Sequence, residues 1–249
     1  MTFAVLADIH GNSDALTAVL ADMASLGVKE AVVLGDHFSG PLEAARCADM
    51  LIPRGFTCIR GNHDRYLVTQ DPAEMGPSDR VAYEQLRPAH LDWLRGLPET
   101  AEISSNVLAC HGTPQSDCRY WLEAVDSDGT PRAATLEEIA AEAPEQAYSL
   151  ILCGHTHIPR QVQLPGGPVI LNPGSVGCPA YDDLHPVYHQ MQTGTPQASY
   201  ALVEKTNSGW LCNLRLVPYD SARMVSLARN HGRLDWAQAL ATGWLPKAE

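Results

Sequence analysis

Five short segments of this 249-residue chain carry side chains of the kinds that bind metal ions, and each follows an apolar run. They are Asp8-Ile9-His10, Gly35-Asp36, Gly61-Asn62-His63-Asp64, His111-Gly112 and Gly154-His155-Thr156-His157. Two metal ions about 3.5–4 Å apart need one shared carboxylate and further ligands on each ion. The segments offer oxygen and nitrogen ligands but no thiolate, which favours Mn, Fe, Zn, Co or Ni over Cu(I) or an iron–sulfur cluster. The pattern therefore predicts a two-metal site.

Alternating strands and helices must position these segments. Buried strands are expected at Phe3–Ala7, Ala31–Leu34 and Phe56–Ile59, with helices from Asn12 or Ser13 to about Leu26 and over Leu42–Leu51. Such a pattern implies parallel strands joined by right-handed crossovers. Ligands of parallel sheets bind beyond the carboxyl ends of the strands. Asp8, Asp36 and Asn62 follow three of these ends, so we expect them to lie together.

The rest of the chain is predicted to add further strands and two helical regions. Residues 65–100 are polar and rich in proline, which indicates a helical insert over the site, with helices near 79–87 and 89–95. Residues 178–197 are predicted as a long polar loop, and a helical tail is expected at about 221–245. Further strands are expected at 106–110, 149–153, 161–164, 169–172, 199–204 and 210–217, with a helix at 135–142. Residues 1–249 are expected to form one domain.

Composition excludes some classes of protein. The formal net charge of −12 argues against nucleic-acid polymers and anionic membrane surfaces as main partners, because both attract clustered lysine and arginine. No apolar run reaches the length of a membrane span, and the N-terminus has no signal-peptide pattern. The seven cysteines are scattered and form no Cys-x-x-Cys pair, which suits reduced thiols in the cytoplasm. The predicted localisation is cytoplasmic.

The order of the five motifs resembles that of the calcineurin-like metallophosphoesterases, especially their small bacterial and archaeal phosphodiesterase branch. The segment Asn172–Gly177 is similar to one that follows the last metal motif in that branch. The resemblance runs from about Phe3 to about Glu204. It implies an α/β fold, a four-layer αββα sandwich of two mixed β-sheets flanked by helices.

The resemblance also implies an assignment of the ligands. One metal would be held by Asp8, His10, Asp36 and His157, and the other by Asp36, Asn62, His111 and His155. The implied cofactors are two divalent transition-metal ions, with Mn expected first and Fe, Zn, Ni or Co as alternatives. His37 is not part of the family's motif, and its orientation stays open.

His63 is the predicted catalytic residue. The implied reaction is in-line attack of metal-bound hydroxide on phosphorus, with His63 protonating the leaving oxygen as a general acid. The neighbouring Asp64 is expected to accept a hydrogen bond from the other ring nitrogen and to raise the pKa of His63. Asn12 and Arg60 are candidate substrate contacts, although a helix cap is the better explanation of Asn12 and a structural ion pair explains Arg60 at least as well.

The resulting hypothesis is a phosphodiesterase that acts on a small phosphodiester or a nucleotide. Diadenosine polyphosphates, cyclic mononucleotides and phosphomonoesters are alternative substrates. A nuclease of the same superfamily would need a basic groove, and a protein phosphatase would need a longer chain. A retromer subunit shares this fold without phosphoesterase activity, so a protein-binding scaffold is the alternative from another class. The substrate, the metal and the oligomeric state are left open by the sequence.

Overall fold

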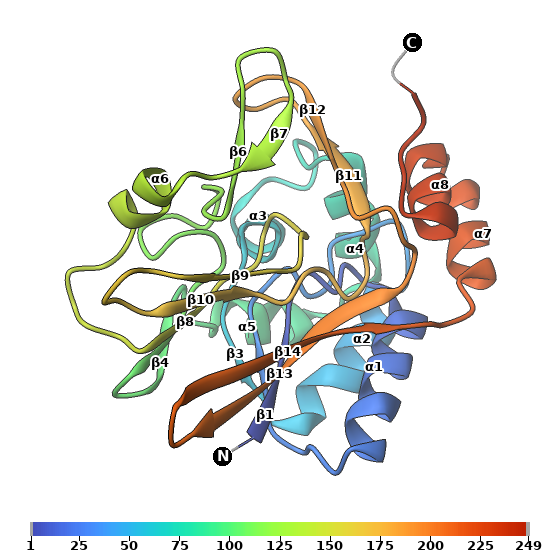
Figure 1. The fold of residues 1–249 in the computed structure, drawn as a ribbon. Coiled ribbons are helices and arrows are strands. Elements are labelled where there is room, and N and C mark those ends of the chain that lie inside the picture. Colours follow the sequence, from blue (N-terminus) through green and yellow to red (C-terminus); the bar gives the residue numbers. More distant parts are fainter. Residues whose placement is uncertain (1, 248–249) are drawn as a thin grey trace.

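Two five-stranded sheets lie face to face in the computed structural model, which describes residues 2–247 (Figure 1). The first sheet has the strand order β14-β13-β1-β2-β3. Its strands are β1 (Thr2–Leu6), β2 (Ala31–Val33), β3 (Thr57–Cys58), β13 (Ala198–Thr206) and β14 (Gly209–Val217). Because β1, β2 and β3 run parallel, their carboxyl ends open on one edge of the sheet.

The second sheet has the strand order β4-β5-β8-β10-β9. Its strands are β4 (Ala101–Ser104), β5 (Val107–Ala109), β8 (Leu150–Leu152), β9 (Arg160–Gln163) and β10 (Val169–Asn172). The three inner strands are parallel, and the two edge strands are antiparallel to their neighbours. The ends of β5 and β8 therefore deliver their motifs to one edge as well.

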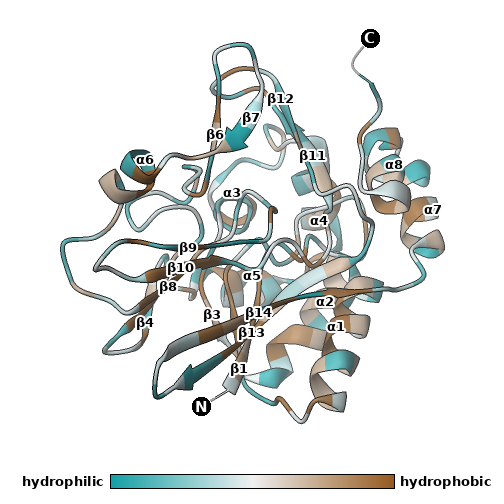
Figure 2. Ribbon diagram, in the orientation of Figure 1, coloured by the Kyte–Doolittle hydropathy of each residue, from teal (hydrophilic) through white to brown (hydrophobic). Residues whose placement is uncertain are grey.

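The side chains of β1 alternate between the two faces of its sheet, and those on one face fill the layer between the two sheets. Phe3, Val5 and Ala7 are buried in the layer between the sheets, whereas Ala4 and Leu6 are buried beneath the helices. Successive strand residues point to opposite faces, and a parallel strand covered on both faces is apolar throughout. Figure 2 shows hydrophobic residues, in brown, along β8, β10 and α1.

Helices cover the outer faces of both sheets, which confirms the predicted fold class. Five of them share an apolar layer with the first sheet: α1 (Ser13–Ser25), α2 (Ala44–Leu51), α3 (Asn62–Thr69), α4 (Pro77–Gln85) and α5 (Pro88–Arg95). A short 3-10 helix, Ile52–Arg54, follows α2. The helix α6 (Leu136–Ala141) packs on the second sheet through Ile139. The last two helices, α7 (Ala222–Asn230) and α8 (Leu234–Thr242), share an apolar cluster with Leu42 and Cys178.

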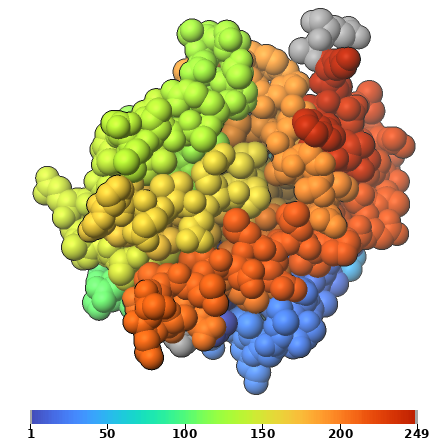
Figure 3. Space-filling view, in the orientation of Figure 1, coloured from blue at the N-terminus to red at the C-terminus, as the bar shows by residue number. Residues whose placement is uncertain are grey.

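Two hairpins stand apart from the sheets, at the top of the view in Figure 1. They are β6 (Glu123–Val125) with β7 (Pro131–Ala133), and β11 (Ala180–Asp183) with β12 (His189–Gln192). The prediction of a loop at residues 178–197 is wrong, because these short strands are too polar to show an apolar run. The space-filling view shows the first hairpin in green beside the second in orange, with α7 and α8 in red next to them (Figure 3). No helix within residues 2–247 has the length and apolar character needed to cross a bilayer.

Candidate metal centre

Five of the seven predicted ligands share an unusual backbone conformation. Asp8, His10, Asp36, His155 and His157 have φ angles between 50° and 69°. This left-handed region is seldom occupied by residues other than glycine. Each such residue costs of order 1–3 kcal/mol, and this kind of strain is concentrated at functional sites. The fold therefore holds these side chains in place at a cost in stability, which indicates a role other than packing.

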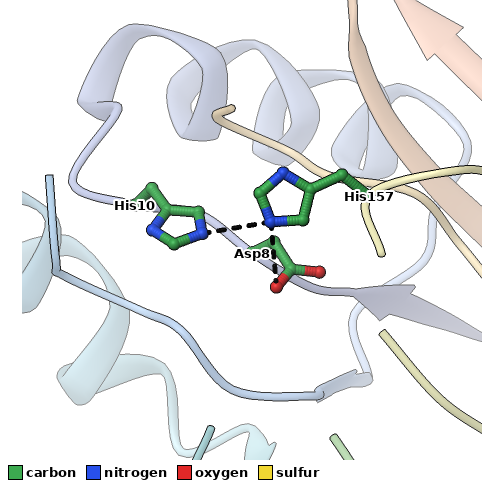
Figure 4. A group of neighbouring side chains, drawn as sticks. All are labelled: Asp8, His10 and His157. Carbon is green, nitrogen blue, oxygen red and sulfur yellow. Dashed lines mark hydrogen bonds and ion pairs between the residues drawn. The ribbon is translucent and has the colours of Figure 1, made fainter. Parts of the chain in front are cut away.

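Asp8, His10 and His157 form a first cluster at the carboxyl end of β1 (Figure 4). The two Nε2 atoms of His10 and His157 are 3.2 Å apart. The His157 Nε2 atom also lies 3.5 Å from Asp8 Oδ1. That oxygen is buried and has no hydrogen-bond partner within residues 2–247. Because a buried carboxylate oxygen that accepts no hydrogen bond is costly, this cluster fits a cation.

Asp36, His111 and His155 form a second cluster. The His111 Nε2 atom lies 3.3 Å from Asp36 Oδ2 and 3.0 Å from Asn62 Oδ1. The same oxygen of Asp36 is 3.8 Å from the His10 Nε2 atom in the first cluster. One carboxylate thus lies between the two clusters, where a ligand shared by two cations is needed. The structure brings all seven predicted ligands together.

Hydrogen bonds to the backbone determine which nitrogen of three histidines faces the site. In each ring the Nδ1–H group donates to a carbonyl oxygen: His10 to Ser39 at 2.8 Å, His111 to Leu34 at 2.7 Å and His157 to Cys178 at 2.7 Å. A carbonyl oxygen only accepts, so Nδ1 carries the proton and Nε2 presents its lone pair to the site. The lone pairs of His10 and His157 face each other, and they need a proton or a metal ion between them.

The charges in the two clusters agree with this arrangement. Burial opposes ionisation of Asp36, but His111, His63 and His10 together outweigh burial and hold the pKa of Asp36 well below its ordinary value. Burial and the nearby His157 lower the pKa of His10 to about 4. Burial also disfavours a charge on His157, yet Asp8 raises the pKa of His157 well above its ordinary value. A proton on His157 therefore balances Asp8 in the metal-free protein, and a divalent cation would displace it.

His63 lies beside the clusters and belongs to neither. Its backbone N–H donates to Asp36 Oδ1 at 3.0 Å, and its ring Nδ1 lies 2.9 Å from Asp79 Oδ1. The Ser39 hydroxyl donates to the same oxygen of Asp79 at 2.6 Å. Burial by itself lowers the pKa of His63, but Asp36 and Asp79 raise it to about 9. Asp79 keeps the proton on Nδ1, so the Nε2 atom of the cationic ring has a proton to give.

Asp64 contacts other groups than the His63 ring, which was its predicted partner. Its carboxylate accepts hydrogen bonds from three backbone N–H groups: those of Asp36 at 2.8 Å, His37 at 3.0 Å and Gly61 at 3.0 Å. It also pairs with the His37 ring at 2.7 Å, and both side chains are fully buried. As the third residue of α3, Asp64 points back to the start of its helix. The partner of His63 is therefore Asp79, whereas Asp64 joins the turns after β2 and β3.

Comparison with known proteins identifies the family. Residues 1–206 match the model of a protein family that is described as "Calcineurin-like phosphoesterase superfamily domain". The chain belongs to this superfamily. The family resemblance expected from the motif order is thereby confirmed, and the matched residues include all seven predicted ligands.

Solved structures of similar fold come from bacteria and archaea. A metallophosphoesterase from Sphaerobacter thermophilus is 24% identical with a TM-score of 0.75, and the match covers 98% of this chain and 100% of that one. The hypothetical protein PH1004 from Pyrococcus horikoshii OT3 is 21% identical with a TM-score of 0.73, over 98% and 99% of the two chains.

A relative is also found by sequence. The uncharacterized protein MJ0912 of Methanocaldococcus jannaschii is 24% identical over 201 residues, which are 71% of this chain and 76% of that protein.

A cavity of about 920 Å³ lies over both clusters. Residues from both hairpins, α4 and α8 line it, including Val125, Asp183, Ser78 and Trp236. A cavity of this volume suits a small organic ligand. Its two lining arginines are already paired: Arg119 with Glu142 at 2.6 Å and Arg233 with Asp235 at 2.6 Å. Both of these guanidinium groups are thus engaged by carboxylates, whereas a long polyanion favours free positive charge.

Asn12 and Arg60, the two predicted substrate contacts, do not line this cavity. The Asn12 Oδ1 atom accepts the Ala15 N–H at 3.0 Å and caps α1, while its Nδ2 atom donates to the Gly177 carbonyl at 3.0 Å. Arg60 donates to Glu99 at 2.8 Å. Both residues thus have the structural partners expected as alternatives, a helix cap and an ion pair, and substrate contact by either residue stays a prediction.

Several residues at the site were not identified from the sequence. Asp79 and Ser39 contact His63 or its partner. The Trp236 ring lies 5.8 Å from the His10 ring, edge to face, and comes from a helix beyond the residues that match the family. These contacts join segments far apart in the chain, so no local motif marks them.

Proposed function

We propose that this protein is a phosphodiesterase that depends on two divalent metal ions and hydrolyses a small phosphodiester or nucleotide. The position of Asp36 supports the proposal, because its Oδ2 atom lies 3.3 Å from His111 and 3.8 Å from His10, one residue in each cluster. Two bound divalent cations would polarise the phosphoryl group and lower the pKa of a water molecule towards about 7.

The chain's own contribution to the reaction is the proton of His63. Asp79 holds the Nδ1 side of the ring, and His63 lines the cavity above the clusters. The raised pKa, about 9 without metal, keeps the ring protonated at neutral pH. A protonated imidazole donates to the oxygen of the departing alcohol, and general acid catalysis of this kind contributes about 10²–10⁴-fold. Bound cations would offset the charge of Asp36 and bring this pKa closer to neutrality.

The donor set limits the metals. The ligands are carboxylate, amide and imidazole groups, which suit Mn, Fe, Co, Ni or Zn. We propose Mn as the working metal, with Fe, Co, Ni and Zn as alternatives, of which Co, Ni and Zn are compared in the experiment below.

The test is an assay of metal-stripped protein with Mn²⁺, Ni²⁺, Co²⁺, Zn²⁺ or Mg²⁺ added back. The substrates are bis(p-nitrophenyl) phosphate, p-nitrophenyl phosphate, a diadenosine polyphosphate and cyclic mononucleotides. Metal-dependent release from the diester in preference to the monoester would support the proposal. Preference for the monoester or for the polyphosphate would replace it with a phosphomonoesterase or a diadenosine polyphosphate hydrolase. Two bound metals without turnover of any ester would favour a protein-binding scaffold.

A pair of variants tests the general acid separately. His63→Ala should reduce hydrolysis of a diester with a poor alkyl leaving group far more than hydrolysis of bis(p-nitrophenyl) phosphate, because p-nitrophenolate leaves without a proton. His231→Ala is the matched control, since His231 is exposed at the end of α7. Equal losses on both esters would refute the role of His63 as a general acid.

A further inference from the structure

Two tyrosines from outside the metal motifs lie against the two histidines of Gly154-His155-Thr156-His157. The Tyr120 ring is centred 5.1 Å from the His155 ring, and the Tyr181 ring is centred 4.5 Å from the His157 ring. His157 belongs to the first cluster and His155 to the second. Each cluster therefore has one histidine that packs against one tyrosine.

The hydroxyl groups of these tyrosines form a hydrogen-bonded chain with one direction. His189 Nδ1 donates to the Val187 carbonyl at 2.8 Å, so its Nε2 atom accepts. Tyr120 lies 2.9 Å from that nitrogen and must donate to it. The single Tyr181 hydroxyl proton is then shared between two acceptors, the Tyr120 oxygen at 2.7 Å and the His155 carbonyl oxygen at 3.2 Å. Both hydroxyl protons are committed, so neither is available to a substrate.

The β11–β12 hairpin supplies both ends of this chain. Tyr181 is in β11 and His189 begins β12, and the two strands are paired through the register Asp183 with His189. Tyr120 comes from the segment before β6 and joins the two ends. The hairpin is thereby connected to the backbone of His155, a residue whose φ of 69° must be held by its surroundings.

We infer that Tyr120 and Tyr181 are positioning residues through which the β11–β12 hairpin fixes His155 and His157 for metal binding. This inference rests on the metal centre of the proposed function but not on its reaction. Groups that orient metal ligands from outside typically change metal affinity by about 10–100-fold when they are removed. The alternative is that the two rings only fill space, in which case their hydroxyl groups are dispensable.

The experiment measures Mn²⁺ binding by chelator competition, with the number of bound ions followed by electron paramagnetic resonance. Tyr181→Phe keeps the ring and removes the hydrogen bonds to Tyr120 and to the His155 carbonyl. We expect its Mn²⁺ dissociation constant to rise about tenfold, the lower end of the usual range. Tyr120→Phe breaks the same chain and should give a similar loss, so it replaces the first variant if that one does not fold.

Tyr188→Phe is the matched control. Tyr188 is in the loop that joins the two strands of the same hairpin, and its side chain is exposed. Its hydroxyl accepts one hydrogen bond from Gln190 at 3.0 Å. It should bind Mn²⁺ as the unmodified protein does. Wild-type Mn²⁺ affinity in both Tyr181→Phe and Tyr120→Phe would overturn the inference. Because no step requires turnover, a protein that binds two ions but hydrolyses no ester would refute the proposed function alone.

Discussion

His63 Nδ1 lies 2.9 Å from Asp79 Oδ1, which connects the motif after β3 to the helix α4. The same carboxylate oxygen accepts the Ser39 hydroxyl at 2.6 Å, so it is held from two sides. The orientation of the proposed general acid therefore depends on α4, whose Ser78 lines the cavity over the two clusters.

Asp79→Asn is expected to shift the alkaline limb of the pH–rate profile to lower pH. Burial lowers the pKa of His63, and Asp79 is one of the two carboxylates that reverse this and raise it to about 9. Since the protonated ring is the active form, a lower pKa means that activity is lost at lower pH. Asp92→Asn is the control, because Asp92 is exposed and paired with Arg95. An unchanged profile in Asp79→Asn would show that the pair does not control the proton of His63.

Asp36→Asn is expected to reduce the number of bound metal ions from two to one or none. The substitution keeps the size of the side chain but removes the charge that lies between the clusters. Activity should fall with the metal content. Metal per chain is measured by mass spectrometry after dialysis, beside Asp128→Asn, whose side chain is exposed. Retention of two ions with the charge removed would mean that Asp36 does not bridge them.

Metal affinity is expected to fall as the pH falls. The pKa of His157 is raised well above its ordinary value by Asp8, against the opposing effect of burial, so this ring must lose a proton before it can bind. His10, whose pKa is about 4, is already neutral near pH 7 and adds little to the dependence. Burial lowers the pKa of His111, but Asp36 raises it to about 9, so this ligand must also lose a proton. Below both pKa values, each released proton weakens binding about tenfold for each pH unit. Titrations at three pH values would test this, and a flat response would contradict it.

Gly61→Ala is expected to destabilise the metal-free protein. A Cβ atom at this position would lie 2.2 Å from Asp36 Oδ1 and 2.7 Å from the Asp36 backbone nitrogen. Overpacking of this kind typically costs about 1–3 kcal/mol. Gly96→Ala provides the comparison, because its nearest neighbour would be the Trp93 carbonyl oxygen at 3.4 Å. Urea unfolding of both variants gives the difference, and equal stabilities would show that the two turns can move apart.

The sequence predicted the ligands because each follows an apolar strand. Strand ends on one edge of a parallel sheet meet, so Asp8, Asp36 and Asn62 could be placed together without knowledge of the fold. The edge strand β4 and the hairpins were not predicted, since short polar strands lack the periodicity that identifies longer ones.

The partner of His63 could not be predicted in the same way. Asp64 is adjacent in sequence, but the geometry of a helix start directs its side chain to the backbone N–H of Gly61. Asp79 reaches His63 only because α4 packs beside α3, a tertiary contact with no local signature. Tyr120 and Tyr181 likewise meet through the packing of separate segments.

The five ligands with left-handed backbone also constrain how this chain can evolve. Glycine would adopt those conformations without strain, so at each of these positions loss of the metal ligand would be accompanied by relief of strain. Where the metal ions are no longer needed, this relief would offset part of the cost of losing a buried side chain. We expect descendants that keep this architecture for another purpose to lose the centre first at positions 8, 10, 36, 155 and 157.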